Sequence, residues 1–360
     1  MFQLNRFLTL LISWLIRKRS LGLRIMRIGS ICLLTSFGIG GVLDISLPLQ
    51  DGQLTVSFDS ASETPSIVLY LTVFTGFTLL VIGLIVVIFE QRSQSKKKVI
   101  VIEIRGLRDG NGASIMDAIP NHLAGYRDHV LYDLRQGIKD GEIVIPSTAI
   151  DQLVYIPADI NRRSNGLDHK DLSIVYGGLA PVPLTFLTGV LIDDESTVLT
   201  LDWDRHSGNW RELDGVDDKI RFRVVGFENE KTRVSPEVAL AISVSYKVHE
   251  HDVISRVGKL PLIQLKLDKG SSDSHWSEQK QNALGKQFLS TAIKLANCGV
   301  KRIHLFLAAQ NSLVFRFGRL YDKRNLPEVV VYQYIRSNDI PHKWGILMPV
   351  CGVDRPMLIE

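Results

Sequence analysis

Hydrophobic positions divide the chain into an N-terminal part with long apolar stretches and a C-terminal part with short ones. The longest stretch, Ile67 to Phe89, holds 23 residues without a charge, which is enough to cross about 30 Å of hydrocarbon as a helix. A weaker stretch runs from about Ile28 to Leu47, with glycines near position 40 and Asp44 close to its end. The pattern predicts a transmembrane hairpin of two helices within residues 21–91.

A third apolar segment, within residues 1–20, has the periodicity of a helix with one apolar face. That face holds Leu4, Phe7, Leu8, Leu11, Trp14 and Leu15. Basic residues follow this segment instead of preceding it, which argues against a cleaved signal peptide. We expect a helix that lies in the membrane interface, bound by apolar burial and by attraction to anionic lipid. A shortened extra span is the alternative.

Small residues recur at helical spacing in both predicted spans. Ser36 and Gly40 are four apart in the first span, Thr72 and Gly76 are four apart in the second, and Gly83 follows one heptad later. Such stripes let helices approach closely inside lipid. They indicate close packing either within one hairpin or between the hairpins of different subunits.

Charged residues predict the orientation of the hairpin. Residues 1–27 hold six Arg or Lys and no acid, residues 44–66 hold four acids and no base, and residues 90–98 add a net charge of +3. The positive-inside rule then places both termini in the cytoplasm and the connecting loop outside, as in a multi-pass membrane protein. Of the total charge of +4, residues 99–360 carry only −1. A domain so close to neutral is poorly suited to binding a DNA or RNA polymer.

Beyond a basic linker at residues 92–98, short apolar strands alternate with amphipathic helices. Strands are expected at residues 99–106, 172–178, 197–204, 261–267, 302–308 and 328–334. Helices are expected after the first strand and over residues 180–192, 277–299 and 311–322. Residues 219–228 and 237–248 are expected to form further strands or a connection between halves. This alternation is typical of a parallel sheet covered on both faces. The sequence therefore predicts an α/β domain over residues 99–360, made of two fused Rossmann-like halves at about 99–225 and 226–360.

The sequence of one predicted helix is repeated in this domain. The segment "LTFLTGVLID" at residues 184–193 returns as "LVFRFGRLYD" at residues 313–322, with five identities at one constant offset. The matched pairs are Leu184/Leu313, Phe186/Phe315, Gly189/Gly318, Leu191/Leu320 and Asp193/Asp322, preceded by Ile174/Ile303 and Ala180/Ala309. We interpret the repeat as the second crossover helix of each half.

Ligands of such sheets bind beyond the carboxyl ends of the strands, and two halves side by side would bring two sets of loops around one composite pocket. The candidate ligand-binding residues in these loops are Arg105, Gly106, Arg108, Tyr176, Gly177, Lys269, Ser271, Trp276, Asn311 and Tyr334. Backbone amides at the glycines and at helix starts suit phosphates, the basic side chains supply countercharge, and the aromatic rings suit stacking on bases. Taken singly, each residue also fits an ordinary turn or a capped helix.

The sequence carries no signature of catalysis. It lacks GxSxG, Walker A and kinase motifs, and the glycines after the first strand do not form the dinucleotide fingerprint, which excludes a membrane-tethered oxidoreductase. The nine histidines are scattered without the spacing of a metal site, and Cys32, Cys298 and Cys351 are too far apart for a CxxC motif. We expect a reducing compartment, no enzyme activity, no metal and no cofactor.

The segment from about Leu262 to Pro349, with "HLFLAAQNSLVFRFGRLYDKRNLPEVVVYQY", resembles the SAVED domain of bacterial CBASS anti-phage systems. The two membrane spans ahead of it resemble the transmembrane effectors of that group. The resemblance implies two CARF-like units that sense a cyclic di-, tri- or tetranucleotide made by a partner nucleotidyltransferase.

These observations together predict a membrane-anchored effector. It binds the cyclic oligonucleotide in its cytoplasmic domain, self-associates, and disrupts the lipid bilayer of the inner membrane to abort phage infection. Two alternatives stay open. One is a two-span sensory receptor, which the outer loop of about 22 residues opposes because it is too short to fold alone. The other is a SAVED-like domain that degrades its ligand, with His275 or His304 as acid or base.

Overall fold

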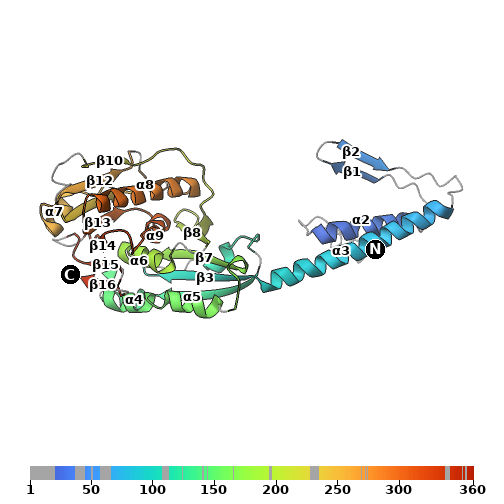
Figure 1. Cartoon of the computed structure of the whole chain (residues 1–360), viewed down its shortest axis with the longest axis horizontal. Helices are drawn as coiled ribbons and strands as arrows, with labels where there is room; N and C mark the ends of the chain where they lie inside the picture. Colours follow the sequence, from blue (N-terminus) through green and yellow to red (C-terminus); the bar gives the residue numbers. More distant parts are fainter. Residues whose placement is uncertain are drawn as a thin grey trace. The chain divides into compact units, whose positions relative to one another are not determined.

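The protein is described from a computed structural model with two compact units, Met1–Lys96 and Lys97–Glu360 (Figure 1). The structure describes residues 21–36, 45–49, 52–56, 66–107, 113–123, 125–139, 142–143, 145–164, 166–193, 197–227, 235–268, 270–271, 273, 275–336, 341–350, 352 and 355–360. The helix predicted within residues 1–20 lies outside these residues and stays a prediction.

The first unit contains the helices α2 (Leu21–Ser36) and α3 (Ser66–Lys96), which run side by side (Figure 1). α3 contains the second predicted span. Its stretch Tyr70–Glu90 is, within the described part of the chain, the one helix long and apolar enough to cross a membrane. α3 continues to Lys96, so most of the segment predicted as a linker is helical.

Glycines form the contact between these two helices. A Cβ atom on Gly29 would lie 2.7 Å from the carbonyl oxygen of Gly76, and one on Gly83 would lie equally close to the α2 backbone. Further along, the Ser36 hydroxyl donates to Thr72 Oγ1 at 2.9 Å. The small residues of the predicted stripe in α3 therefore serve packing within one hairpin.

The first predicted span differs from the structure at both ends. α2 ends before the strand β1 (Ile45–Leu49), which pairs antiparallel with β2 (Gly52–Val56). Pro48 disfavours a helix in this segment, because proline has no amide hydrogen and its ring clashes with the preceding turn. The helix is thus shifted toward the N-terminus and includes Arg24 and Arg27, which the sequence placed ahead of the span.

The second unit contains two large sheets, each built around four parallel strands, and the small two-stranded sheet of β5 (Ile138–Lys139) and β6 (Glu142–Ile143). In sheet order, the first consists of β4 (Tyr126–Asp133), β3 (Lys98–Arg105), β7 (Leu172–Leu179), β8 (Val198–Asp204) and β9 (Asn209–Glu212). The second consists of β10 (Arg223–Val225), β12 (Leu262–Lys266), β11 (Glu237–Ser243), β13 (Arg302–Ala308), β14 (Glu328–Tyr332), β15 (Gly345–Leu347) and β16 (Met357–Ile359). The antiparallel strands are β9 in the first sheet and β10, β15 and β16 in the second.

The parallel strands follow the same order in both sheets. Counted along the chain within each half, the order is 2-1-3-4, as β4-β3-β7-β8 and as β12-β11-β13-β14. The predicted α/β fold of two Rossmann-like halves is confirmed. The structure differs in that β11, expected as an extra strand or a connection, is a central strand that opens the second half, and β4 was not expected. β10, which ends at residue 225, belongs to the second sheet.

Equivalent connections follow equivalent strands. The first strand of each half is followed by η1 (Ile115–Ala118) in the first half and by α7 (Glu250–Val257) in the second. The second strand is followed by α4 (Pro146–Leu153) and α5 (Ile156–Ser164) in the first half and by α8 (Glu278–Asn297) in the second. The third strand is followed by α6 (Val182–Ile192) in the first half and by α9 (Asn311–Arg319) in the second. Short elements in the first half are η2 (Arg135–Gly137), β5 (Ile138–Lys139), β6 (Glu142–Ile143) and η3 (His169–Asp171). The helix expected after the first strand is the single turn η1. α8 begins as predicted, because the Ser277 hydroxyl accepts from the Lys280 amide at 3.3 Å.

The repeated helices α6 and α9 cross each other at their matched glycines. A Cβ atom on Gly189 would lie 2.9 Å from Gly318 Cα and closer still to the carbonyl oxygen of Phe315. A Cβ atom on Gly318 would meet Gly189 and the carbonyl oxygen of Phe186 in the same way. The glycine of each helix thus lies against the backbone of the repeated phenylalanine in the other helix. The two helices are related by an approximate two-fold axis at this crossing.

One hydrophobic core joins the two halves around this crossing. α6 contacts β14 and β15 of the second sheet, and α9 contacts β7 and β8 of the first. The ring of Tyr176 stacks on Phe315 with centroids 3.6 Å apart, and Phe186 meets Phe288 edge to face. Separating the halves would expose this core to water, so they fold as one domain.

Candidate ligand site at the junction of the two halves

The start of each repeated helix is held by a side chain from the other half. At α9, the amide of Ser312 donates to Oδ2 of Asp202, which lies near the end of β8, at 3.1 Å. At α6, the amide of Val182 donates to Oε1 of Gln333, just after β14, at 3.1 Å. Amides at helix starts have no hydrogen-bond partner within their own helix. Each half therefore supplies a side-chain acceptor for the first turn of the other half's helix.

Asp202 is the centre of a buried polar cluster. Its exposed fraction is 4%, and its Oδ2 atom also faces Nε2 of His275 at 3.3 Å. Its Oδ1 atom accepts from the Trp203 amide at 2.8 Å. The buried Gln281 amide group donates to the His275 carbonyl and to the Ser312 hydroxyl, both at 2.8 Å. This carboxylate is therefore held by donors from both halves, as a buried charge requires.

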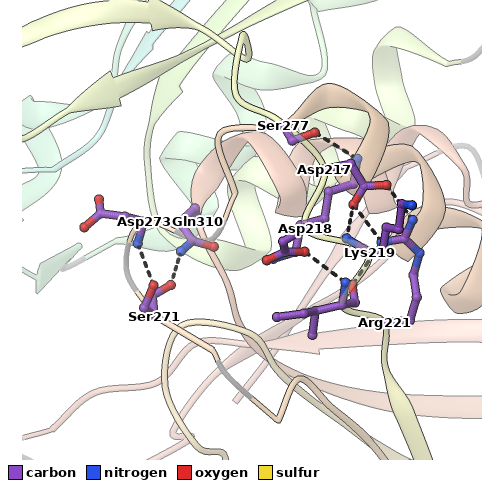
Figure 2. Close-up of polar contacts among 10 residues, drawn as sticks. Asp217, Asp218, Lys219, Arg221, Ser271, Asp273, Ser277 and Gln310 are labelled. Carbon is purple, nitrogen blue, oxygen red and sulfur yellow. Dashed lines mark hydrogen bonds and ion pairs between the residues drawn. The ribbon is translucent and has the colours of Figure 1, made fainter.

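The loop before α8 folds back onto the start of α9. Figure 2 shows Ser271 between two neighbours: its hydroxyl accepts from the Asp273 amide at 3.3 Å, and its carbonyl accepts from the Gln310 side chain at 2.9 Å. Trp276 follows later in this loop, and the guanidinium of Arg211 from β9 lies over its ring, 4.9 Å from the ring centroid. The loop before α8 thus contacts both the segment that precedes α9 in its own half and Arg211 of the first half.

The connection between the halves lies across the start of α8. The Gly215 amide donates to the Trp276 carbonyl at 2.7 Å. The buried Lys280 ammonium lies 2.7 Å from a carboxylate oxygen of Asp218. Asp217 pairs with Arg221 at 2.6 Å (Figure 2). The pKa of Asp217 is lowered to about 2, first by the hydrogen bond from Arg221. These pairs keep the connection charged and in place at neutral pH.

In the first half, the predicted residues Arg105 and Gly106 lie at the end of β3. Arg105 donates to Oε1 of Glu103 at 2.6 Å, and His129 faces the other oxygen of this buried carboxylate at 2.8 Å. The Gly106 amide donates to the Leu179 carbonyl at 2.6 Å. Arg105 therefore already has a carboxylate partner, and Gly106 holds β3 against the end of β7.

Tyr176 and Gly177 are buried in β7. Both faces of the Tyr176 ring are covered, and burial raises the pKa of its hydroxyl. A Cβ atom on Gly177 would lie 2.9 Å from the Trp210 ring and closer to Ile115. In this structure, both residues pack the core under the site, and Tyr176 offers no open ring face to a base.

The remaining candidates lie around the helix starts. Asn311 accepts from the Thr185 hydroxyl at 3.3 Å and so links α9 to α6. Tyr334 is 49% exposed and meets His342 edge to face. Ser271 lies beside Gln310 and Asn311 begins α9, whereas Trp276 lies just before α8 beside His275. Tyr334 follows Gln333, the residue that caps α6. Arg108 and Lys269 lie outside the described residues.

Sequence reasoning missed Asp202 and Gln333, which join the halves. It also missed Gln281 and Gln310, which connect the loop before α8 to the start of α9, and treated His275 only as a remote acid or base. The one available signal was position. Asp202 and Gln333 each lie close to the carboxyl end of a predicted strand. Within the described residues, no group of three or more His, Cys, Asp or Glu side chains could hold a metal ion.

Two family models match the chain. Residues 156–348 match the SMODS-associated and fused to various effectors sensor domain, SAVED, and residues 1–150 match the SAVED-fused 2TM effector domain. The second match extends beyond the hairpin, through β3 and β4 of the first half. No curated protein matches the chain in sequence.

Several solved structures are similar to the chain. One is the Cap4 SAVED/CARF-domain containing receptor of Acinetobacter baumannii with the cyclic trinucleotide 2′3′3′-cAAA, at 14% identity and a TM-score of 0.48, covering 78% of this chain and 58% of that one. Another is the Moraxella osloensis Cap4 receptor, at 13% identity and a TM-score of 0.44, covering 78% and 56%. The chain thus spans little more than half the length of these receptors. The chain belongs to the SAVED family of sensor domains, fused here to a two-transmembrane effector domain.

Proposed function

We propose that the junction of the two halves binds a cyclic oligonucleotide. The observation that carries this proposal is the reciprocal capping of α6 and α9, which brings the loops of both halves around one approximate two-fold axis. A ring of repeated nucleotides suits a site that presents similar elements twice. Membership in the SAVED family supports the same ligand class, which a partner nucleotidyltransferase would make in a CBASS anti-phage system.

The bound ligand would drive self-association of the protein in the bacterial inner membrane. Contacts between single hairpins in lipid are weak, but an assembly of sensor domains raises their effective concentration. The ligand achieves this only if it binds the assembled state more tightly than the free one. The gathered hairpins would then disrupt the bilayer and abort phage infection, without enzyme activity in this chain. Both termini would face the cytoplasm, where the ligand is made.

The test uses the full-length chain in dye-loaded vesicles and a panel of cyclic di-, tri- and tetranucleotides. We expect one ligand to raise the melting temperature of the protein and to release the dye. Thermal stabilisation without dye release would support sensing and contradict membrane disruption. The absence of both responses across the panel would contradict the proposed function as a whole.

Single substitutions test the location of the site. Arg105→Ala and Lys269→Ala should each weaken ligand binding about tenfold or more, as charge-assisted hydrogen bonds to phosphate are worth about 1.5–3 kcal/mol. Lys170→Ala is the matched control, because Lys170 is exposed on η3, ahead of the amino end of β7. Full affinity in both site variants would place the ligand elsewhere.

A further inference from the structure

The register of the membrane hairpin is fixed by two contacts of α2, one at its start and one near its middle. A Cβ atom on Gly22 would lie 2.7 Å from the Val87 amide nitrogen, and one on Gly29 would lie 2.8 Å from the Leu80 amide nitrogen. Both partners belong to the uncharged stretch of α3, which ends at Phe89. α2 therefore lies beside the apolar part of α3 and not beside its polar end.

This register places two arginines of α2 deep beside the apolar stretch. Arg24 and Arg27 lie between the two glycine contacts, and Arg27 is level with about Leu80. Leu80 is nine residues before Phe89, which corresponds to about 13 Å along a helix at 1.5 Å per residue. Neither arginine can be treated as part of a flank outside the hydrocarbon.

Both arginines are exposed on the surface of the hairpin. They are three residues apart, so they project from the same side of α2. Neither α2 nor the apolar stretch of α3 contains an Asp or Glu that could pair with them at this depth. Charged side chains at hydrocarbon depth avoid lipid and face a bundle interior or a water-filled cavity. The outer side of α3 exposes a long row of large apolar side chains that includes Phe74 and Phe77, whereas α2 exposes its two arginines together with Leu21, Ile28 and Leu34.

We propose that Arg24 and Arg27 line a water-filled, anion-conducting path between several copies of this chain. The inference rests on the proposed function, since the ligand must gather the hairpins first. In the assembly, α2 faces the path and the apolar row of α3 faces lipid. Water and mobile anions screen the repulsion between arginines of neighbouring copies, and rings of basic side chains select anions in pores. The lesion in the membrane is then a selective conduit and not a general rupture.

The test is a reversal potential across a planar bilayer that contains the full-length chain, with a KCl gradient and the same panel of cyclic nucleotides. We expect the permeability to chloride to exceed that to potassium several-fold. The variant R24Q/R27Q should bring this ratio close to one, and R24E/R27E should invert it. R24K/R27K is the matched control and should keep the preference for chloride.

The outcomes separate this inference from the proposed function. A ligand-triggered current that does not discriminate between the ions, or a preference that R24Q/R27Q leaves unchanged, overturns the arginine-lined path and leaves membrane disruption standing. No current with any nucleotide overturns both. If the double variants fail to insert, as judged by flotation with vesicles, the wild-type reversal potential and the single variant Arg27→Gln still decide the question.

Discussion

Replacing either glycine at the crossing of α6 and α9 with alanine should destabilise the sensor domain. A Cβ atom on Gly189 would press on the backbone of α9, and one on Gly318 on the backbone of α6. Backbone atoms inside a packed helix cannot turn away as a side chain can. The two helices would have to move apart by about 1 Å, which would loosen dispersion contacts along the whole interface.

Two opposing terms determine the size of the effect. Gly→Ala inside a helix gains about 1 kcal/mol of helix propensity, while inserting a methyl group into a packed core costs about 1–3 kcal/mol and occasionally more. Because the obstacle at this crossing is backbone on both sides, we expect the cost to exceed the upper end of that range. The net loss should be about 2 kcal/mol, which lowers the ratio of folded to unfolded protein about 30-fold. The double variant should lose less than the sum of the two, because the first methyl group already separates the helices.

Gly285→Ala is the matched control. Gly285 also lies inside a helix, α8, but its Cβ atom would meet only the tip of the Leu320 side chain, which can rotate away. This variant should be as stable as the wild type or slightly more stable. Urea unfolding of the full chain in detergent, followed by tryptophan fluorescence, reports on the second unit, which holds four of the five tryptophans. If Gly189→Ala and Gly285→Ala unfold at the same urea concentration, the crossing is not as tight as the structure indicates.

Burial lowers the pKa of His342 to about 4. The neutral form therefore stabilises the fold fully above the unfolded pKa of about 6.5, and about 3 kcal/mol of this stability should be lost as the pH falls toward 4. Urea titrations at pH 7 and 4.5 measure this loss, and His342→Gln should reduce the difference between them. Tyr176→Phe removes a buried hydroxyl with no hydrogen-bond partner among the described residues and should raise the free energy of unfolding by about 1 kcal/mol, whereas a lower value would reveal an unseen partner. Gly76→Leu or Gly83→Leu should separate α2 from α3 and lower the yield of monodisperse protein extracted from membranes, while Phe77→Leu on the exposed side should not; equal yields would mean that the glycines do not hold the hairpin.

Elements with a strong local pattern could be predicted from the sequence. The run of β-branched and apolar residues in β13 gave its bounds, Arg302–Ala308, because both faces of this strand are buried. The identities at one offset identified α6 and α9 as equivalent helices. The structure adds the reason for these identities: glycine is the only residue small enough at the crossing, and each phenylalanine contributes the carbonyl that approaches it.

Strand order and helix register could not be predicted, because they depend on contacts between distant segments. β11 has the same apolar pattern as its neighbours, and nothing local shows that it lies between β12 and β13. The membrane hairpin posed the same problem. In the sequence, the positive charges of Arg24 and Arg27 indicate a cytoplasmic flank of the span. Only the close contacts of the glycines between α2 and α3 show that the two arginines lie beside the apolar stretch.

The sequence could indicate where a ligand site is expected but not the contacts around it. The rule that ligands bind beyond the carboxyl ends of parallel strands points to the loops after these strands, and this location stays a prediction. It could not show that Asp202 reaches Ser312 across 110 residues of sequence, or that Gln333 reaches Val182 across 151. Nor could it distinguish a ring that is open to a ligand from one, such as Tyr176, that is stacked inside the core.

The reciprocal caps have a consequence for how a ligand acts on the domain. α6 and α9 approach each other most closely at one pair of glycines. The bonds from Asp202 to the Ser312 amide and from Gln333 to the Val182 amide resist rotation of one helix against the other about this crossing, because each joins the sheet of one half to the helix of the other. A ligand that contacts the loops at both helix starts therefore acts on both halves at once. Its binding energy would then favour one relative orientation of the two halves, and a change in this orientation would alter the surface that the sensor domain offers to another copy.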